Sequence, residues 1–492
     1  MKILLVYPEY PVTFWSFKHA LKFVSKKATS PPLGLLTVAA LLPTEFTKKL
    51  IDLNVSSLED VDIEWADYVF ISAMAIQRES VGKVIDRCRK LGVKTVAGGP
   101  LFTASHADFS DVDHLVLNEA EVTLPIFLED LKNDSALHIY STKERPELKD
   151  TPSPIWDLID MKHYATMNIQ YSRGCPFDCD FCDIGVLYGH RVRTKSREQM
   201  LTELESLYSH GWKGGVFMVD DNFIGNKGKL KREILPAITE WMEKRNHPFV
   251  FNTEASINLV DDEELMMMMT EAGFDTVFIG IETPDENGLA ECGKIQNKDR
   301  DLVACVKKIQ KFGLMVTGGF IVGFDSDTPS IFNRMSAFIQ ESGIVTAMVG
   351  ILNAPLETRL YKRLENEGRI IENITGNNTD LSLNFIPRMD REALIEGYKS
   401  IVNSIYSPKD YYKRIRILLR QYQPVSHGIT PIKLNEVGAL VKSIFRLGIT
   451  EPKRRYYWGL FFWSIFRHPK LFPMAITFAI YGFHFRKIIE EY

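Results

Sequence analysis

Three closely spaced cysteines are the residues of this sequence whose type and spacing point most directly to metal chemistry. Cys175, Cys179 and Cys182 form a C-x3-C-x2-C run. Soft thiolate ligands at this spacing favour an iron–sulfur cluster, whereas a structural zinc site needs four ligands, commonly two C-x2-C pairs. His190 is the one neighbouring side chain that could complete a zinc site. Because three thiolates leave one iron of a four-iron cube open for a substrate or cofactor, we predict a catalytic [4Fe–4S] cluster.

The other cysteines and the composition indicate an intracellular globular protein. Six cysteines in 492 residues do not make a disulfide framework, so Cys88, Cys292 and Cys305 are predicted to be free thiols. The net charge of −4 gives no basic signature for nucleic acid. The chain starts with a short apolar strand instead of a secretory leader, and no apolar run reaches the roughly 18 residues of a spanning helix. We therefore expect a cytoplasmic protein with no nucleic-acid partner.

Residues 1–145 show the pattern of a doubly wound, Rossmann-like α/β domain. Strands are expected at residues 2–7, 49–55, 67–74, 95–97 and 114–118, with helices at 32–42 and 80–91. Continuous apolar strands between helices indicate a parallel sheet covered on both faces. Ligands bind such sheets at the carboxyl ends of the strands. Those ends carry Pro8, Glu9, Tyr10, Ser72, Gly98, Gly99 and Glu119.

A polar linker is expected over residues 140–154, and a second domain over residues 160–388. Its expected strands cover residues 167–171, 216–219, 249–253, 277–281, 314–322 and 345–352. Helices are expected between them, at 197–209, 230–244, 262–272, 299–312 and 329–341. This rhythm predicts an open, partial (β/α)6 barrel, short of a closed TIM barrel. The three cysteines directly follow its first strand.

Residues 389–492 are predicted to form a helical C-terminal domain that is rich in aromatic and basic residues. Residues 453–458 read Lys-Arg-Arg-Tyr-Tyr-Trp, a combination that suits the headgroup level of a bilayer. The apolar stretch 471–483 contains Pro473 and is too short to span a membrane. Two interpretations stay open: peripheral contact with the inner face of a membrane, or a helical cap whose aromatic residues pack on the barrel.

The cysteine loop carries a resemblance to a known family. A C-x3-C-x-aromatic-C loop after a first barrel strand, with Phe181 at the aromatic position, resembles the radical S-adenosylmethionine superfamily. The resemblance implies that the open iron binds S-adenosylmethionine and that one electron from the cluster cleaves it. The resulting 5′-deoxyadenosyl radical would take a hydrogen atom from an unactivated carbon, with the cofactors carrying the difficult chemistry.

The same resemblance implies residues that contact S-adenosylmethionine. Residues 280–282, Gly-Ile-Glu, resemble the family's strand end beside the cofactor, so Gly280 and Glu282 are candidates. Phe181 of the cysteine loop is a further candidate. Equivalent strand ends contribute Asp220, Glu254, Ser256 and Gly318. Each of these could instead be an ordinary turn or cap residue.

The N-terminal domain resembles the cobalamin-binding subclass of that superfamily. Residues 31–35, Pro-Pro-Leu-Gly-Leu, match a segment of the subclass, and residues 118–121 resemble its G-E-x-E segment with Asn118 replacing glycine. Cobalamin is thus expected, with Leu33 and Gly34 joining the strand-end residues as candidate contacts. Because no D-x-H-x-x-G motif is present, we predict binding without a histidine ligand. A domain that binds no cofactor is the alternative; without G-x-G-x-x-G, a dinucleotide is not expected.

Four stretches narrow the resemblance to enzymes related to hopanoid C-2 methylase: residues 10–16, 253–259, 319–325 and 352–360. This implies methyl transfer to an unactivated carbon of a lipid-like substrate, hopanoid or isoprenoid. It also implies a reducing electron donor such as flavodoxin or ferredoxin. Two alternatives remain: an enzyme that forms a carbon–carbon bond or ring on a lipid without cobalamin, and an iron–sulfur sensing protein without turnover.

Overall fold

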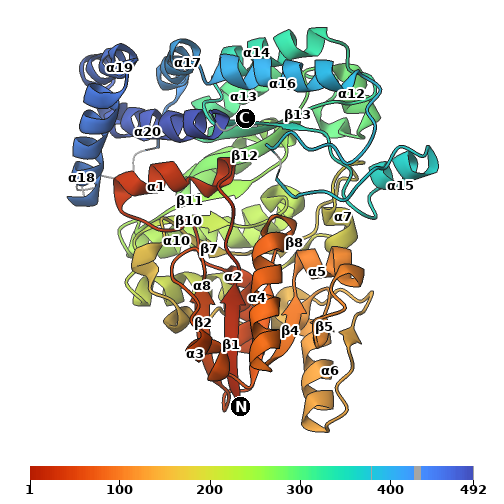
Figure 1. Cartoon of the computed structure of the whole chain (residues 1–492). Helices are drawn as coiled ribbons and strands as arrows, with labels where there is room; N and C mark the ends of the chain where they lie inside the picture. Colours follow the sequence, from red (N-terminus) through yellow and green to blue (C-terminus); the bar gives the residue numbers. More distant parts are fainter. Residues whose placement is uncertain (378, 426–433, 491–492) are drawn as a thin grey trace.

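The computed structural model describes residues 1–377, 379–425 and 434–490, and its first part is a parallel sheet (Figure 1). The sheet order is β2-β1-β3-β4-β5-β6. The strands are β1 (Lys2–Tyr7), β2 (Thr47–Asp52), β3 (Tyr68–Ser72), β4 (Lys94–Gly98), β5 (His114–Val116) and β6 (Ile139–Tyr140). The helices are α1 (Lys18–Val24), α2 (Leu33–Leu41), α3 (Asp60–Glu64), α4 (Arg78–Leu91), α5 (Pro100–Ser105) and α6 (Ala120–Lys132).

The apolar strand β1 shows why this sheet is covered on both faces. Its side chains alternate between two buried clusters, because successive residues of a strand point to opposite faces. Ile3 and Leu5 pack with residues of α2 and α6, and Leu4 and Val6 pack with residues of α3, α4 and α5. The predicted doubly wound fold is confirmed. Strand β6 lies where the sequence pattern indicated the start of a linker, and it pairs in parallel with β5.

The second part is a parallel, open sheet in the order β14-β13-β12-β11-β10-β7. Its strands are β7 (Met167–Ile169), β10 (Gly214–Met218), β11 (Phe249–Glu254), β12 (Phe274–Glu282), β13 (Met315–Val322) and β14 (Ala347–Ile351). Its helices are α7 (Ile184–Leu187), α8 (Arg197–Ser209), α9 (Lys227–Lys229), α10 (Leu235–Lys244), α11 (Glu263–Glu271), α12 (Glu286–Glu291), α13 (Leu302–Lys311), α14 (Ser330–Ser342) and α15 (Arg359–Asn366). The predicted partial barrel is confirmed. A two-stranded antiparallel hairpin, β8 (Ser172–Arg173) with β9 (Arg193–Thr194), was not predicted.

The third part is helical and packs against helices of both preceding parts. Its helices are α16 (Arg391–Ile405), α17 (Pro408–Gln421), α18 (Leu434–Ser443), α19 (Arg454–Arg467) and α20 (Phe472–Ile489), with a π-helical turn at Ile444–Thr450. Helix α16 lies on α14, and α20 lies beside α1 of the N-terminal part (Figure 1). The rings of Phe14 and Phe485 stack at 4.3 Å, and His484 Nε2 donates to the carbonyl O of Phe14 at 2.9 Å. Helix α20 therefore caps the fold with buried aromatic residues.

None of the helices in the described residues is both long and apolar enough to cross a bilayer.

Candidate active site

The unpredicted hairpin β8–β9 closes the cysteine loop. Arg173 pairs with Arg193 across the hairpin, so residues 174–192 form a loop with both ends held together. Gly174 has φ +90°, and a Cβ there would lie 2.8 Å from the carbonyl oxygens of Arg191 and Gly189. Only glycine adopts this conformation readily and fits this space. The loop therefore leaves the hairpin in a tight turn, and the N–H of Cys175 donates to the carbonyl of Gly189 at 3.2 Å.

The three cysteines fit an iron–sulfur cluster. Cys175, Cys179 and Cys182 are half-buried, and none is in a disulfide. Asn222 Nδ2 lies 3.9 Å from the sulfur of Cys175 and donates to it. Burial raises the pKa of all three thiols, and the nearby ammonium of Lys294 partly opposes that rise. Since metals bind thiolates, cluster binding must release these protons.

A site for one metal ion differs from a cluster site, because in a cluster each thiolate binds a different iron atom. Over the described ranges, no group of three or more His, Cys, Asp or Glu side chains is placed to hold one metal ion. His190 Nδ1 instead lies 3.1 Å from the carbonyl of Phe177.

A small, separate apolar cluster packs against Phe181 of the cysteine loop. Phe181 packs against buried residues that include Cys292, Phe324 and Leu360. The N–H of Asp180 donates to the carbonyl of Cys292 at 3.0 Å. From α15, Arg359 pairs with Asp178 at 3.1 Å and also with Asp180. Sequence reasoning missed Arg359, although it lies within the stretch 352–360 that carried the resemblance. The structure thus gives Phe181 a packing role in the loop.

The end of strand β12 folds a carboxylate back over its own backbone. Glu282 is buried with φ +63°, and its Oε1 accepts from Lys294 Nζ at 2.5 Å. Asn297 Nδ2 donates to the carbonyls of Gly280 and Ile281, both at 3.0 Å. Burial alone would lower the pKa of Lys294, but Glu282 and the thiol of Cys179 raise it above its usual value. Lys294 and Asn297 were not found from the sequence.

Gly280 makes room for this ion pair, which gives a first testable prediction. A Cβ at residue 280 would collide with Glu282 Oε1 and lie 2.8 Å from Lys294 Nζ. Gly280→Ala should destabilise the protein by about 1–3 kcal/mol, as overpacking does, and weaken S-adenosylmethionine binding. Urea unfolding and equilibrium dialysis measure the two effects. Gly82→Ala in α4 is the control, because no atom lies within 4 Å of its added Cβ; an equal loss in both variants would contradict the role of Gly280.

Two acids at the end of β10 hold the start of the cysteine loop. Asp220 accepts from Ser172 Oγ at 2.5 Å and from the N–H of Tyr171 at 3.3 Å, and Asp221 accepts from the N–H of Gly174 at 2.8 Å. Burial raises the pKa of Asp220 to about 7 and that of Asp221 to about 6. Asp220 is therefore placed to position the loop, and its predicted contact with S-adenosylmethionine stays a prediction.

Of the other predicted strand-end residues, Ser256 and Glu254 lie near the cysteine loop or its acids, and Gly318 lies within a strand. Ser256 Oγ donates to Asn258 Oδ1 at 2.7 Å and accepts from Asn222 at 3.2 Å, so one chain of hydrogen bonds joins Ser256 to the sulfur of Cys175. Glu254 ends β11 near the same acids. Gly318, in contrast, lies within β13, where an added Cβ would meet the ring of Phe320 at 2.9 Å.

The crowding of acids around Glu254 predicts a pH dependence. Burial, together with Asp221 and Asp220, raises the pKa of Glu254 to about 8. A raised pKa in the folded state stabilises the protein at low pH, and this stabilisation is lost progressively as the pH rises from the ordinary glutamate pKa of 4.5 to about 8. Between about pH 6 and about pH 9, the unfolding free energy of Glu254→Gln should therefore fall less than that of the wild type, by about 2–3 kcal/mol. Calorimetry at both pH values measures this.

A matched variant at an exposed glutamate tests whether the pH dependence comes from the buried surroundings of Glu254. Glu243→Gln changes an exposed glutamate at the end of α10. It should keep the pH dependence of the wild type; a flatter profile in this variant than in Glu254→Gln would contradict the assignment.

Glycines at the carboxyl ends of the first sheet let its strands approach one another closely. Gly99 has φ +89°, and a Cβ there would lie 2.6 Å from Ser72 Oγ, so β3 and β4 approach closely at their ends. A Cβ at Gly98 would lie 2.6 Å from the carbonyl of Val116. Gly34, at the start of α2, has no atom within 4 Å of an added Cβ. The open space beside Gly34 would let a ligand approach the backbone there, which fits cobalamin. The contacts of Gly98 and Gly99 with cobalamin stay predictions.

Hydrogen bonds hold the loop at residues 8–10, which follows β1 at this end of the sheet. Gln77 Nε2 donates to the carbonyl of Pro8 at 2.5 Å, and the N–H of Tyr10 donates to Asn54 Oδ1 at 2.8 Å. Glu9 is exposed and lies 3.4 Å from Lys18 Nζ. Pro8 and Tyr10 thus have anchored backbones, and the Glu9 side chain points to solvent.

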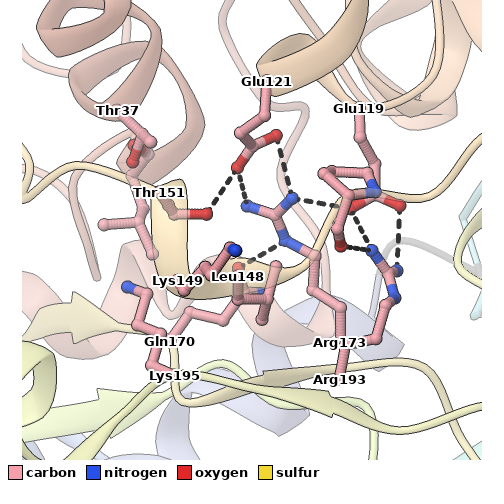
Figure 2. A network of polar contacts seen from close by, with 12 residues as sticks. Thr37, Glu119, Glu121, Leu148, Lys149, Thr151, Gln170, Arg173, Arg193 and Lys195 are labelled. Atoms are coloured by element: carbon pink, nitrogen blue, oxygen red, sulfur yellow. Dashed lines mark hydrogen bonds and ion pairs between the residues drawn. The ribbon is translucent and has the colours of Figure 1, made fainter.

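Glu119 joins the two parts of the molecule (Figure 2). It follows β5, is only 4% exposed, and pairs with Arg173 and Arg193 at 2.8 Å each. Glu121 pairs with Arg173 at 2.8 Å and accepts from Thr151 Oγ1 at 2.8 Å. The arginines belong to the two strands of the hairpin that closes the cysteine loop. The carboxylate of Glu119, predicted as a cobalamin contact, is therefore engaged by the cluster hairpin.

Fold and site together define a class of enzyme. A doubly wound domain precedes a partial barrel whose first strand leads into a loop with three free cysteines. Family models match the same parts: "B12 binding domain" over residues 24–128, "Radical SAM superfamily" over 169–339, and "Domain of unknown function (DUF4070)" over 358–492. This is the class of radical S-adenosylmethionine enzymes that also carry a cobalamin-binding domain.

Full-length relatives specify the family. An uncharacterized methyltransferase of Synechocystis is 39% identical over 100% of this chain and 93% of the relative. Hopanoid C-2 methylase of Rhodopseudomonas palustris is 31% identical over 93% of this chain and 88% of the relative. The structure of the radical S-adenosylmethionine methyltransferase TsrM from Kitasatospora setae, with cobalamin and a [4Fe–4S] cluster bound, shares the fold: TM-score 0.62, 12% identity, 100% of this chain and 99% of that one.

The chain belongs to the cobalamin-dependent radical S-adenosylmethionine methyltransferases. It is an enzyme, so the alternative of a sensing protein without turnover is wrong. Its cofactors are those of the class: a [4Fe–4S] cluster, S-adenosylmethionine and cobalamin.

Proposed function

We propose that this enzyme methylates an unactivated carbon of a lipid-like substrate of the hopanoid or isoprenoid class. The observation that carries the proposal is the relationship to hopanoid C-2 methylase along 93% of this chain, which takes in the helical C-terminal part as well as the two cofactor-binding parts. We further propose a cytoplasmic enzyme that receives electrons from a donor such as flavodoxin or ferredoxin and contacts a membrane from its inner face.

We assign the cofactors to the residues described above. When bound, the cluster and S-adenosylmethionine supply a 5′-deoxyadenosyl radical, and cobalamin supplies the methyl group. Cys175, Cys179 and Cys182 would hold the cluster. Around S-adenosylmethionine, the Glu282–Lys294 pair would offer a buried charge pair beside the loop, and Ser256 would offer a hydroxyl. The strand ends at residues 8–10, 72 and 98–99, with residues 33–34, would face cobalamin.

The protein itself would position the two cofactor-binding parts relative to each other. The hairpin and the Asp220–Asp221 pair hold the cysteine loop against the end of the barrel. The Glu119 ion pairs hold the first sheet's carboxyl end toward the same hairpin. Such positioning matters because a reactive radical must meet its target within a short distance and away from water.

The test is methylation of membrane lipids by the reconstituted enzyme. The protein is purified anaerobically with cobalamin supplied, analysed for iron and cobalt, and incubated with reductant and S-adenosylmethionine carrying a deuterated methyl group. Mass spectrometry of added hopanoid and isoprenoid lipids should show a gain of one labelled methyl group. A product that lacks the label and has lost two hydrogens would instead indicate ring closure and overturn the proposal.

A further inference from the structure

The outer face of α17 carries a row of four basic residues. Lys409, Lys413, Arg416 and Arg420 are spaced by four, three and four residues, which places them on one face of the helix. They line a pocket of about 260 Å³ between α17 and α19, together with Tyr412, Ile417 and Tyr456. Across the described parts of the chain, none of the four forms an ion pair, and no acidic residue lines the pocket. The pocket therefore concentrates positive charge.

The two arginines are held in place although they repel each other. Their guanidinium groups lie over the ring of Trp463, at 5.5 Å for Arg416 and 5.7 Å for Arg420. Burial, and then the charge of Arg420, lower the pKa of Arg416. Arg416 Nε has no hydrogen-bond acceptor among the described residues. A guanidinium N–H without an acceptor suits a phosphate, whose oxygens accept hydrogen bonds from such donors.

Helix α19, which lines the pocket, and the neighbouring α18 carry exposed apolar side chains. On α18 and the following π-helical turn, exposed apolar residues recur every fourth position, and one turn of α19 adds three more: Val437, Val441, Phe445, Ile449, Phe462, Ile465 and Phe466. Phe445 is 62% exposed and Phe466 is 78% exposed. Helix α19 packs against both the π-helical turn and α17, and Figure 1 shows α17, α18 and α19 together at one side of the molecule. Large aromatic side chains left in water mark a contact surface.

We propose that the basic pocket and the apolar surface form one docking site for an anionic phospholipid bilayer. A lipid phosphate would occupy the pocket, and the apolar side chains of α18 and α19 would enter the boundary between headgroups and acyl chains. The occupant is a bilayer because this pattern, a basic rim beside aromatic residues on helices too short to span, is what interfacial binding requires. The inference deepens the proposed function, on which it rests, by naming the surface that brings the enzyme to a lipid substrate.

The experiment is flotation of the full-length protein with vesicles. Vesicles of phosphatidylcholine alone are compared with vesicles of equal parts phosphatidylcholine and phosphatidylglycerol. The wild type should float with the anionic vesicles. The variant Lys413→Gln/Arg416→Gln/Arg420→Gln should bind them about 100-fold more weakly, since each basic residue near an anionic surface is worth roughly fivefold in affinity. Phe462→Ser/Phe466→Ser should also lose binding.

A matched control removes equal charge elsewhere. Lys90→Gln/Lys94→Gln/Lys132→Gln alters three exposed lysines of the first part of the molecule and should float like the wild type. Equal flotation of the α17 variant and this control would overturn the proposal. So would a protein that inorganic phosphate stabilises through Arg416 and Arg420 but that anionic vesicles do not bind, because the pocket would then serve a free anion. Methylation of detergent-dispersed lipid by the α17 variant separates a docking failure from a failure of the proposed function.

Discussion

Replacing Glu119 with Gln should destabilise the protein more than any other single change at the contact between its two cofactor-binding parts. The change leaves Arg193, which is 3% exposed, and Arg173 without their shared carboxylate. Removing one partner of a buried ion pair typically costs about 3–5 kcal/mol, because the remaining charge is buried without compensation. Urea unfolding of the apoprotein measures the loss. Hydrogen exchange of residues 172–194 should accelerate, since the hairpin loses its anchor.

Two controls separate the buried network from ordinary surface charge. Glu121→Gln removes one of two carboxylates from Arg173 and leaves Arg193 paired, so its effect should be smaller. Glu147→Gln breaks an exposed pair with Arg191 and should cost less than about 1 kcal/mol. In a double-mutant cycle, Glu119→Gln and Arg193→Gln should couple strongly. Additive effects, or unchanged exchange of the hairpin, would show that Glu119 does not position the cysteine loop.

The parts of the fold that were predicted correctly are those whose signals are local. The apolar run of β1 sends alternate side chains to two clusters, and that requirement is visible in six consecutive residues. The cysteine loop follows a strand at a spacing that sulfur ligation of a cluster requires. Such features need no knowledge of what lies opposite them in space. This is why the strand positions, and the place of the cysteine loop after the first barrel strand, could be predicted from the sequence.

The parts that were missed depend on contacts between distant residues. Arg173 and Arg193 lie 54 and 74 residues from Glu119, and no periodicity links them. The G-E-x-E resemblance predicted a cobalamin contact for Glu119, which stays a prediction; what the sequence did not reveal is that its carboxylate pairs with the cluster hairpin. Likewise, Lys294 meets Glu282 only because Gly280 and a backbone with positive φ let the carboxylate turn back. Local patterns identify a strand end, but only packing decides what its side chains contact.

Two interpretations of the aromatic residues in the helical tail, a packed cap and a membrane contact, each match one of its helices. Phe478, Phe483 and Phe485 of α20 are buried, as expected of a cap. Phe462 and Phe466 of α19 are exposed, as an interfacial contact requires. The sequence offered one basic and aromatic stretch for both, and hydropathy alone does not distinguish them because both helices are rich in phenylalanine.

Exchange of any one of the three loop cysteines for alanine should abolish the chemistry. Cys175→Ala, Cys179→Ala or Cys182→Ala each removes one of three protein ligands, and a cube held by two thiolates loses iron readily. We expect iron and sulfide contents far below those of the wild type after anaerobic reconstitution, with the cluster's absorption band lost. Release of 5′-deoxyadenosine from S-adenosylmethionine under reducing conditions should fall to background.

The other cysteines make this test specific to the loop. Cys305→Ala changes a half-buried thiol on α13 and should keep iron content and 5′-deoxyadenosine release at wild-type levels. Cys292→Ala removes a buried thiol that packs in the same cluster as Phe181 and keeps the backbone carbonyl that accepts from the N–H of Asp180, so it should retain the cluster while loosening the packing around Phe181. Because Cys292 lies beside the loop without belonging to the motif, retention of iron there would show that spacing, and not mere proximity of sulfur, defines the ligands. Cleavage that survives loss of Cys175, Cys179 and Cys182 together would contradict the assignment of the active site.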